Sequence, residues 1–153
     1  MNFGPIVDVD WLRHELGQAD LRLVDCRWKL GEPGAGRNAY AAGHIPGAAF
    51  LDLDSDLSDP PGPRGRHPLP DAERFERTAR AAGVSNGSRV VAYDEAGEGG
   101  AARLWWLLRH FGHEAVAALD GGQITKTVQT GFSIVTAQNM NGDQKDALYK
   151  SSC

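Results

Sequence analysis

Apolar residues along the chain fall into two patterns, short continuous runs and sets at helical spacing. The run LRLVDCR has the length of a buried strand. Trp11, Leu12 and Leu16 share one helical face, and later Phe75 and Ala79 share another. The pattern predicts helices over 8–16, 71–83 and 100–112, a helical turn over 38–44, and strands over 21–27, 47–53, 88–94 and 114–122.

Strands and helices alternate along residues 1–122. Such alternation favours βαβ units, a mainly parallel sheet and helices on both of its faces, which is an α/β fold. The helix predicted over 100–112 is apolar on nearly every side, so we expect it to be mostly buried. Parallel sheets carry functional loops beyond the carboxyl ends of their strands, so the loop after Tyr93 is a candidate site.

Composition narrows the classes of function. A net charge of −4 argues against a general nucleic-acid-binding protein, which needs clustered Lys and Arg. No apolar run approaches the roughly 18 residues of a membrane helix, and the N-terminus lacks the layout of a signal peptide, so we expect a cytoplasmic protein. Cys26 and Cys153 are too few for a disulfide framework, which fits a reducing compartment.

The composition changes sharply near residue 123. Residues 1–122 contain twelve Arg and one Lys, whereas residues 123–153 contain three Lys and no Arg. We therefore divide the chain into a domain over 1–122 and an atypical tail over 123–153. The tail is either a polar extension of the domain or a segment of another origin, grafted, recombined or engineered. Its Thr, Val and Ile around Gly131 fit a β-hairpin, with disorder and helix as the alternatives.

The loop over 94–100 has the shape of a phosphate-binding turn without its chemistry. A phosphate cradle needs a lysine and a hydroxyl after its last glycine, and dinucleotide binding needs another glycine spacing. Here two alanines follow, and Asp94 and Glu95 would repel an anion. We interpret Gly97, Gly99 and Gly100 as an open loop that tolerates positive φ. Asp94 would cap the helix that follows.

The acidic segment DLDSDLSDP, residues 52–60, has the alternating aspartates of a calcium loop but not its other ligands. Counted from Asp52, the sixth and twelfth positions hold Leu57 and Pro63, where a glycine and a glutamate are needed. We therefore expect a solvated acidic loop, no metal site and no bound cofactor.

Histidines, arginines and one cysteine offer further chemistry. His67 lies in RGRHPLP, where it is either simply exposed or able to orient an anion or shuttle a proton. Arg64 and Arg66 beside it could form a weak anion site. We expect His44 in GHIPG to stabilise its turn by a hydrogen bond.

Cys26 ends an apolar strand, and we expect an inert core residue, since burial and a neighbouring carboxylate raise the pKa of a thiol.

Six motifs occur in a characteristic order: LVDCR, GHIPGAAFLDLDSDLSD, RHPLP, VVAYD, AARLWWLLRHFGH and LDGG. Through them the chain resembles the rhodanese-like sulfurtransferases over roughly residues 5–122, which implies a three-layer α/β fold around a mostly parallel sheet. More narrowly, it is similar to the N-terminal half of the two-domain thiosulfate or 3-mercaptopyruvate sulfurtransferases. In that family a cysteine in the loop after the fourth strand carries sulfur as a persulfide.

The resemblance implies half of a catalytic site. The family's nucleophilic cysteine belongs to the C-terminal repeat, and the matching position here is Asp94, which cannot hold a persulfide. An aspartate and a histidine of the N-terminal repeat reach towards that cysteine, and they match Asp54 and His67. Asp54 would orient His67, and His67 would assist proton movement near the thiolate. Alone, the chain is then expected to transfer no sulfur, and a sulfur-donor anion would bind it only weakly.

Two departures from the family pattern affect the surface of the molecule. A complete tandem enzyme is considerably longer, and QITKTVQTGF replaces the helix that follows LDGG in the family. Loss of that helix would uncover apolar sheet, so we expect the tail or a second copy of the chain to cover it, giving a homodimer or a swapped tail. The alternative interpretation of the chain is a binding or structural module that keeps the fold and has no enzymatic role.

Overall fold

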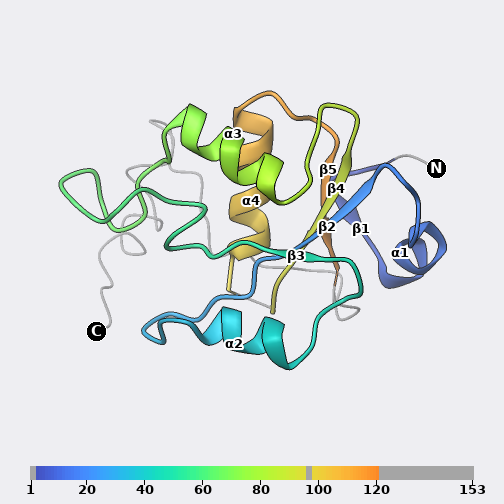
Figure 1. Cartoon of the computed structure of the whole chain (residues 1–153), viewed down its shortest axis with the longest axis horizontal. Coiled ribbons are helices and arrows are strands. Elements are labelled where there is room, and N and C mark those ends of the chain that lie inside the picture. Colours follow the sequence, from blue (N-terminus) through green and yellow to red (C-terminus); the bar gives the residue numbers. More distant parts are fainter. Residues whose placement is uncertain (1–2, 96–97, 121–153) are drawn as a thin grey trace, which may run out of the picture. The chain divides into compact units, whose positions relative to one another are not determined.

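All strand pairs of the central sheet are parallel. The computed structural model describes residues 3–95 and 98–120, in which five strands have the order β1-β5-β4-β2-β3 (Figure 1). The predicted α/β fold with a mostly parallel sheet is confirmed. The elements are β1 (Ile6–Val7), α1 (Val9–Glu15), β2 (Leu21–Asp25), α2 (Ala35–Ala42), β3 (Ala49–Phe50), α3 (Ala72–Ala81), β4 (Arg89–Tyr93), α4 (Gly100–His110) and β5 (Val116–Leu119).

Some element boundaries differ from the sequence pattern. β1 lies outside the predicted elements, because two residues are too short to produce a periodic signal. α2 begins at Ala35, three residues before the predicted start, after Gly34 in the left-handed region with φ 81°. No side chain caps that end, so the sequence carries no capping signal there. β3 keeps only two of the residues predicted over 47–53.

Alternating side chains of β2 and β4 divide the core into two layers. Val24 and Val90 point to one face, where they pack with side chains of α3 and α4. Leu23 and Val91 point to the other face, where α1 covers them through Leu12. Figure 1 shows α3 and α4 on one side of the sheet and α1 on the other. The predicted cover on both faces is therefore confirmed.

α4 is buried along one face rather than all round. Leu104, Leu107 and Leu108 have at most 3% of their surface exposed. Trp106 has 43% exposed, and its ring stacks on His110 with the centroids 4.7 Å apart. The expectation of a buried helix is thus wrong for its outer face, because residue type alone does not separate a core Trp from an exposed one.

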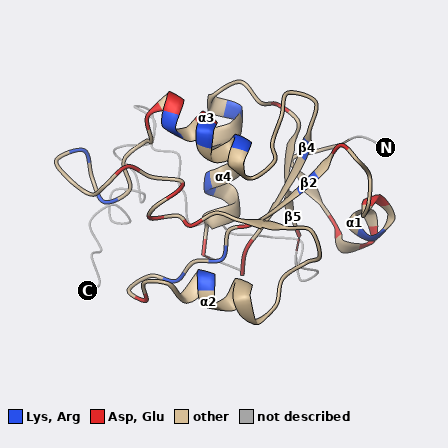
Figure 2. Ribbon diagram, viewed as in Figure 1, with Lys and Arg blue, Asp and Glu red and all other residues tan. Residues whose placement is uncertain are grey.

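α3 begins and ends with the signals that its sequence carries. Oδ1 of Asp71 accepts hydrogen bonds from the backbone N of Glu73 and of Arg74, both at 3.1 Å. Charges of both signs lie along the helix (Figure 2), with Glu73 in its first turn and Arg80 in its last, as the helix dipole favours. Gly83 follows the last turn with φ 84°.

The GHIPG turn is held by its histidine, as predicted. Nδ1 of His44 lies 2.8 Å from the carbonyl oxygen of Tyr40, and the two rings stack with centroids 3.8 Å apart. No helix within residues 3–95 and 98–120 has the length and apolar character needed to cross a membrane. The tail over 123–153, with its possible hairpin and dimer contact, lies outside the described residues, as does the predicted strand end at 121–122.

Candidate functional site

The carboxyl ends of β2, β3 and β4 bring three loops together. β2 lies between its two neighbours, with Asp25 in register with Tyr93 on one side and Phe50 on the other. The pairing continues just past the strands, where the Cys26 N donates to the Tyr93 carbonyl at 2.7 Å. On the opposite side the Leu51 N donates to the Asp25 carbonyl at 3.0 Å. Parallel sheets commonly hold their ligands and catalytic groups beyond such an edge.

Asp54 and His67, the two residues that the resemblance paired, are in direct contact. Nε2 of His67 lies 2.7 Å from Oδ1 of Asp54. The other carboxylate oxygen, Oδ2, accepts a hydrogen bond from the indole Nε1 of Trp28 at 2.8 Å. Partial burial opposes ionisation, but the hydrogen bonds from Trp28 and His67 prevail and lower the pKa of Asp54. Asp54 is therefore a carboxylate held between two donors.

The acidic segment around Asp54 forms hydrogen bonds within itself. Oδ1 of Asp52 accepts from the backbone N of Asp54 at 2.9 Å and of Ser55 at 3.0 Å. Oδ2 of Asp56 accepts from the Asp52 N at 2.8 Å, and Leu57 is fully buried beneath the turn. Asp54 and Ser55 are exposed, as expected of a solvated acidic loop, whereas Asp52 and Asp56 are half-buried and their carboxylates also serve as turn acceptors. That arrangement leaves Asp54 to contact the neighbouring loop.

Arg103 of α4 anchors the loop that carries His67. Its Nη2 donates to the carbonyls of His67 and Pro68, both at 3.1 Å, and its Nε donates to the Leu57 carbonyl at 3.2 Å. Burial among these groups lowers the pKa of Arg103. Sequence reasoning missed both Arg103 and Trp28. They act on residues 36 and 26 positions away along the chain, and neither residue type marks a site by itself.

The two arginines beside His67 differ in their surroundings. Nη2 of Arg64 pairs with Oδ2 of Asp59 at 2.8 Å, so the positive charge of Arg64 already has a carboxylate partner. Partial burial raises the pKa of Asp54, the two hydrogen bonds described above lower it, and the positive charge of Arg66 lowers it further. The weak anion site predicted at both arginines therefore depends on Arg66, and it stays a prediction.

Asp94, the first residue after β4, caps α4 from the far end of the loop between them. Its Oδ2 accepts a hydrogen bond from the backbone N of Ala101 at 2.8 Å, seven positions along the chain. This contact confirms the predicted capping. Burial raises the pKa of Asp94, against backbone hydrogen bonds that act in the other direction. The carboxylate thus occupies the helix N-terminus, where an anion would otherwise bind.

The glycines of this loop serve different purposes. Gly99 has φ 81°, as expected for an open loop. Positive φ does not explain Gly100, whose backbone instead lies against the carbonyl of Cys26 and leaves no room for a side chain. Glu95 is exposed at the edge of the loop, and Gly97 lies outside the described residues. The loop is therefore shaped by close packing of α4 on the peptide that follows β2 as much as by conformational freedom.

Two fully buried groups lie behind these loops. The carboxylate of Asp25 accepts hydrogen bonds from Nε and Nη2 of Arg27, the shortest at 2.6 Å. Burial, followed by the charges of Asp94 and Asp25, raises the pKa of the Cys26 thiol well above its ordinary value. The predicted core position of Cys26 is confirmed. A thiol held protonated and away from solvent is a poor nucleophile, and the inertness of Cys26 stays a prediction.

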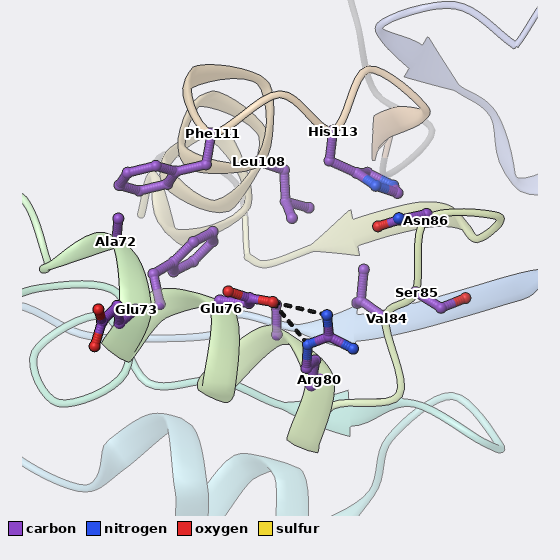
Figure 3. Close-up of a pocket in the computed structure, with 12 residues that line it drawn as sticks. Ala72, Glu73, Glu76, Arg80, Val84, Ser85, Asn86, Leu108, Phe111 and His113 are labelled. Atoms are coloured by element: carbon purple, nitrogen blue, oxygen red, sulfur yellow. Dashed lines mark hydrogen bonds and ion pairs between the residues drawn. The ribbon is translucent and has the colours of Figure 1, made fainter.

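A separate hollow lies at the amino end of the sheet (Figure 3). It has a volume of about 340 Å³ and lies between α3, the turn before β4 and the end of α4. Of its charged residues, Glu73, Glu76 and Arg80, the last two pair with each other along α3 at 2.7 Å, and Phe75 packs on Phe111 with ring centroids 5.2 Å apart. Within residues 3–95 and 98–120 no group of His, Cys, Asp and Glu is arranged to hold a metal ion. The candidate site is thus the Asp54–His67 pair at the opposite, carboxyl end.

Known sequences match most of the chain. The family described as Rhodanese-like domain matches residues 8–123. Thiosulfate/3-mercaptopyruvate sulfurtransferase 2 of Arabidopsis thaliana is 38% identical over 149 residues, which cover 97% of this chain and 41% of the relative. The probable 3-mercaptopyruvate sulfurtransferase of Pseudomonas aeruginosa is 42% identical over 125 residues, 80% of this chain and 44% of the relative. The chain thus spans less than half the length of these relatives.

Solved structures give the same picture. The 3-mercaptopyruvate sulfurtransferase from Leishmania major superimposes with a TM-score of 0.69 at 32% identity, over 77% of this chain and 33% of that one. SseA from Escherichia coli, described with the 3-mercaptopyruvate sulfotransferases, has a TM-score of 0.65 at 37% identity, over 77% and 46%. One Arabidopsis thaliana relative is named as mitochondrial, so the cytoplasmic location expected for this chain stays a prediction.

Proposed function

The chain belongs to the rhodanese-like domains related to the thiosulfate/3-mercaptopyruvate sulfurtransferases, and we propose that it is the N-terminal half of such an enzyme. In this role it supplies Asp54 and His67 to a persulfide-forming cysteine of another repeat. The observation that carries the proposal is the 2.7 Å contact between Nε2 of His67 and Oδ1 of Asp54 at the carboxyl edge of the sheet. The loop after β4 begins with Asp94 and contains no cysteine, in keeping with a supporting half.

Sulfur transfer from 3-mercaptopyruvate needs a proton carrier. A thiolate that attacks the donor sulfur forms a persulfide and breaks the carbon–sulfur bond, and pyruvate leaves as its enolate. The proton of the donor thiol must reach the enolate carbon. A single imidazole such as His67 can take this proton as a base and return it as an acid. With thiosulfate the leaving group is sulfite, a stable anion that requires no proton.

The carboxylate of Asp54 suits the chemistry of His67. A neighbouring negative charge stabilises the imidazolium that forms when the ring takes up a proton, and the hydrogen bond holds the ring in place. His67 keeps 25% of its side-chain surface exposed, so the ring is open to a substrate or to another repeat. By contrast Cys26 is fully buried, so this thiol does not supply the nucleophile.

The test is a sulfurtransferase assay with 3-mercaptopyruvate and with thiosulfate, cyanide being the acceptor. The chain is assayed alone and fused to a C-terminal repeat that carries the loop cysteine. We expect background activity from the chain alone and turnover from the fusion. His67→Ala should lower kcat/KM for 3-mercaptopyruvate by roughly 10²-fold or more, since general acid–base catalysis contributes about 10²–10⁴-fold. The effect on thiosulfate should be clearly smaller.

His14→Ala is the matched control, because His14 is an exposed histidine of α1 with 78% of its side chain accessible. It should leave both activities unchanged. Turnover by the chain alone that disappears in Cys26→Ala or Cys153→Ala would contradict the proposal. Equal effects of His67→Ala and His14→Ala in the fusion would contradict it too, and would favour a module without an enzymatic role.

A further inference from the structure

Trp28 touches both members of the Asp54–His67 pair. Its indole Nε1 donates to Oδ2 of Asp54 at 2.8 Å. Its ring meets the imidazole of His67 edge to face, with centroids 5.5 Å apart and an interplanar angle of 84°. The backbone N of Trp28 donates to Oε2 of Glu98 at 3.1 Å, so the main chain of the residue is held as well as its ring. Trp28 is thus placed to control how the pair is oriented.

The hydrogen bonds also determine which nitrogen of His67 carries the proton. An indole N–H can only donate, so Oδ2 of Asp54 is an acceptor. With its pKa lowered, Asp54 is ionised and has no proton to give. Oδ1 must therefore accept from Nε2 of His67, which lies 2.7 Å away. In the neutral ring the proton is then on Nε2, and Nδ1 carries the free lone pair.

A clamp on Asp54 is needed because this carboxylate is accessible to water. Half of its side-chain surface is exposed, so water competes for both oxygens, and rotation about its last side-chain bond costs little. A donor fixed on Oδ2 removes this freedom and keeps Oδ1 facing the histidine. The short Asx turn at Asp52 holds the backbone of Asp54 but does not determine the rotation of its carboxylate.

We propose that Trp28 is a positioning residue: by holding Oδ2 of Asp54 it directs Oδ1 to Nε2 of His67 and leaves Nδ1 as the nitrogen that takes up and returns the proton. The catalytic task given to Nδ1 rests on the function proposed above. The clamp itself does not, and it can be tested in the chain alone.

The first experiment is ¹⁵N NMR of the His67 ring in the full chain, at a pH where the ring is neutral. The wild type should show the Nε2–H tautomer. Trp28→Phe keeps an aromatic ring and removes only the donor, so it should raise the Nδ1–H population severalfold, and Asp54→Asn should do the same. Trp106→Phe is the matched control, since Trp106 is exposed and stacks on His110. A Trp28→Phe spectrum identical to that of the wild type would overturn the proposal.

A second measurement needs no variant. The indole proton of Trp28 should shift as Asp54 is protonated, with a midpoint below the ordinary aspartate pKa. If the chemical shift of the Trp28 indole proton does not change as Asp54 is protonated, the proposed clamp is wrong.

Kinetics then separate the two proposals. In the fused enzyme, Trp28→Phe should lower kcat for 3-mercaptopyruvate about tenfold with little change in KM, as expected for an interaction that matters in the transition state. If the NMR result holds but kcat is unchanged, the clamp exists and the proton-transfer task given to Nδ1 fails, whereas His67→Ala still decides the role of His67. If neither effect appears, the clamp fails.

Discussion

The backbone of Gly100 lies directly against the carbonyl oxygen of Cys26. A Cβ added to Gly100 would lie 2.0 Å from that oxygen, far inside van der Waals contact. Gly36 has the same relationship to the next peptide, where a Cβ would lie 1.7 Å from the Arg27 carbonyl oxygen. The first turns of α2 and α4 therefore press on consecutive peptides after β2, and they can do so only because both residues lack a side chain.

Gly100→Ala should destabilise the protein by about 1–3 kcal/mol or more, the usual cost of overpacking, because backbone rather than a flexible side chain must move. Urea unfolding followed by circular dichroism measures the change. The control is Gly87→Ala, since Gly87 has open space around its Cβ position and no left-handed φ. That change should be neutral or slightly stabilising. Equal stability of the two variants would contradict the close approach.

Asp25→Asn should cost about 3–5 kcal/mol, the usual penalty for breaking a buried ion pair from one side. Asp25 is fully buried, and the side chain of Arg27, 19% exposed, would lose its charged partner. Glu76→Gln is the matched control, because its pair with Arg80 lies on the surface of α3, where such pairs contribute less than about 1 kcal/mol. The midpoints of urea unfolding of the two variants, each compared with that of the wild type, measure these losses of stability. A small loss in Asp25→Asn would show that the pair matters little.

Asp94→Asn should alter the dependence of stability on pH. Burial raises the pKa of Asp94, so between the unfolded and the folded pKa the folded state binds more protons than the unfolded state. The free energy of unfolding therefore falls as the pH rises through the folded pKa. Asn keeps an acceptor for the Ala101 N–H without the charge, so the variant should be the more stable protein at neutral pH.

The difference between wild type and Asp94→Asn should vanish as the pH falls below the ordinary aspartate value. Urea unfolding of both proteins across the acidic range measures it. A wild type that is more stable than the variant at neutral pH would show that the ionised cap outweighs the cost of burial.

The Cys26 thiol should react with thiol reagents only when the protein unfolds. It is fully buried and its pKa is raised well above the ordinary value, chiefly by burial. The measurement is labelling with a chromogenic disulfide at pH 8 in a Cys153→Ser background, which leaves Cys26 as the single thiol. Labelling should be slow in buffer and complete in urea. Rapid labelling in buffer would show that the Cys26 thiol is reactive in the folded protein, and Cys26 would again be a candidate nucleophile.

Arg103→Lys should loosen the loop of His67 without unfolding the domain. A lysine has one nitrogen and cannot reach the carbonyls of Leu57, His67 and Pro68 together. Hydrogen exchange of the amides between 57 and 69 should become several times faster. Arg109→Lys on the same helix is the control, since Arg109 lies over the Trp105 ring and pairs with Glu114 instead. Unchanged exchange in Arg103→Lys would contradict its anchoring role.

The local pattern of the sequence was enough for much of the fold and for some of the site. Runs of apolar residues predicted β2 and β4, the helical spacing of Phe75 and Ala79 predicted α3, and Asp94 was expected to cap α4. These signals are local, because a strand or a helix turn is determined by residues a few positions apart. The burial of Cys26 was also predicted, since this residue ends an apolar run of strand length.

The pairing of Asp54 with His67 was expected from the family resemblance, but only the tertiary structure showed which other residues hold the pair. Trp28 reaches Asp54 across 26 positions of the chain, and Arg103 reaches the His67 loop across 36. Both contacts exist because the strand order places β2 between β4 and β3, so that loops distant in sequence meet at one edge. Hydrophobic periodicity describes each element separately and carries no information on this order. The sequence thus determined most of the elements and two of the caps, while packing of the parallel sheet brought Trp28 and Arg103 to the Asp54–His67 pair.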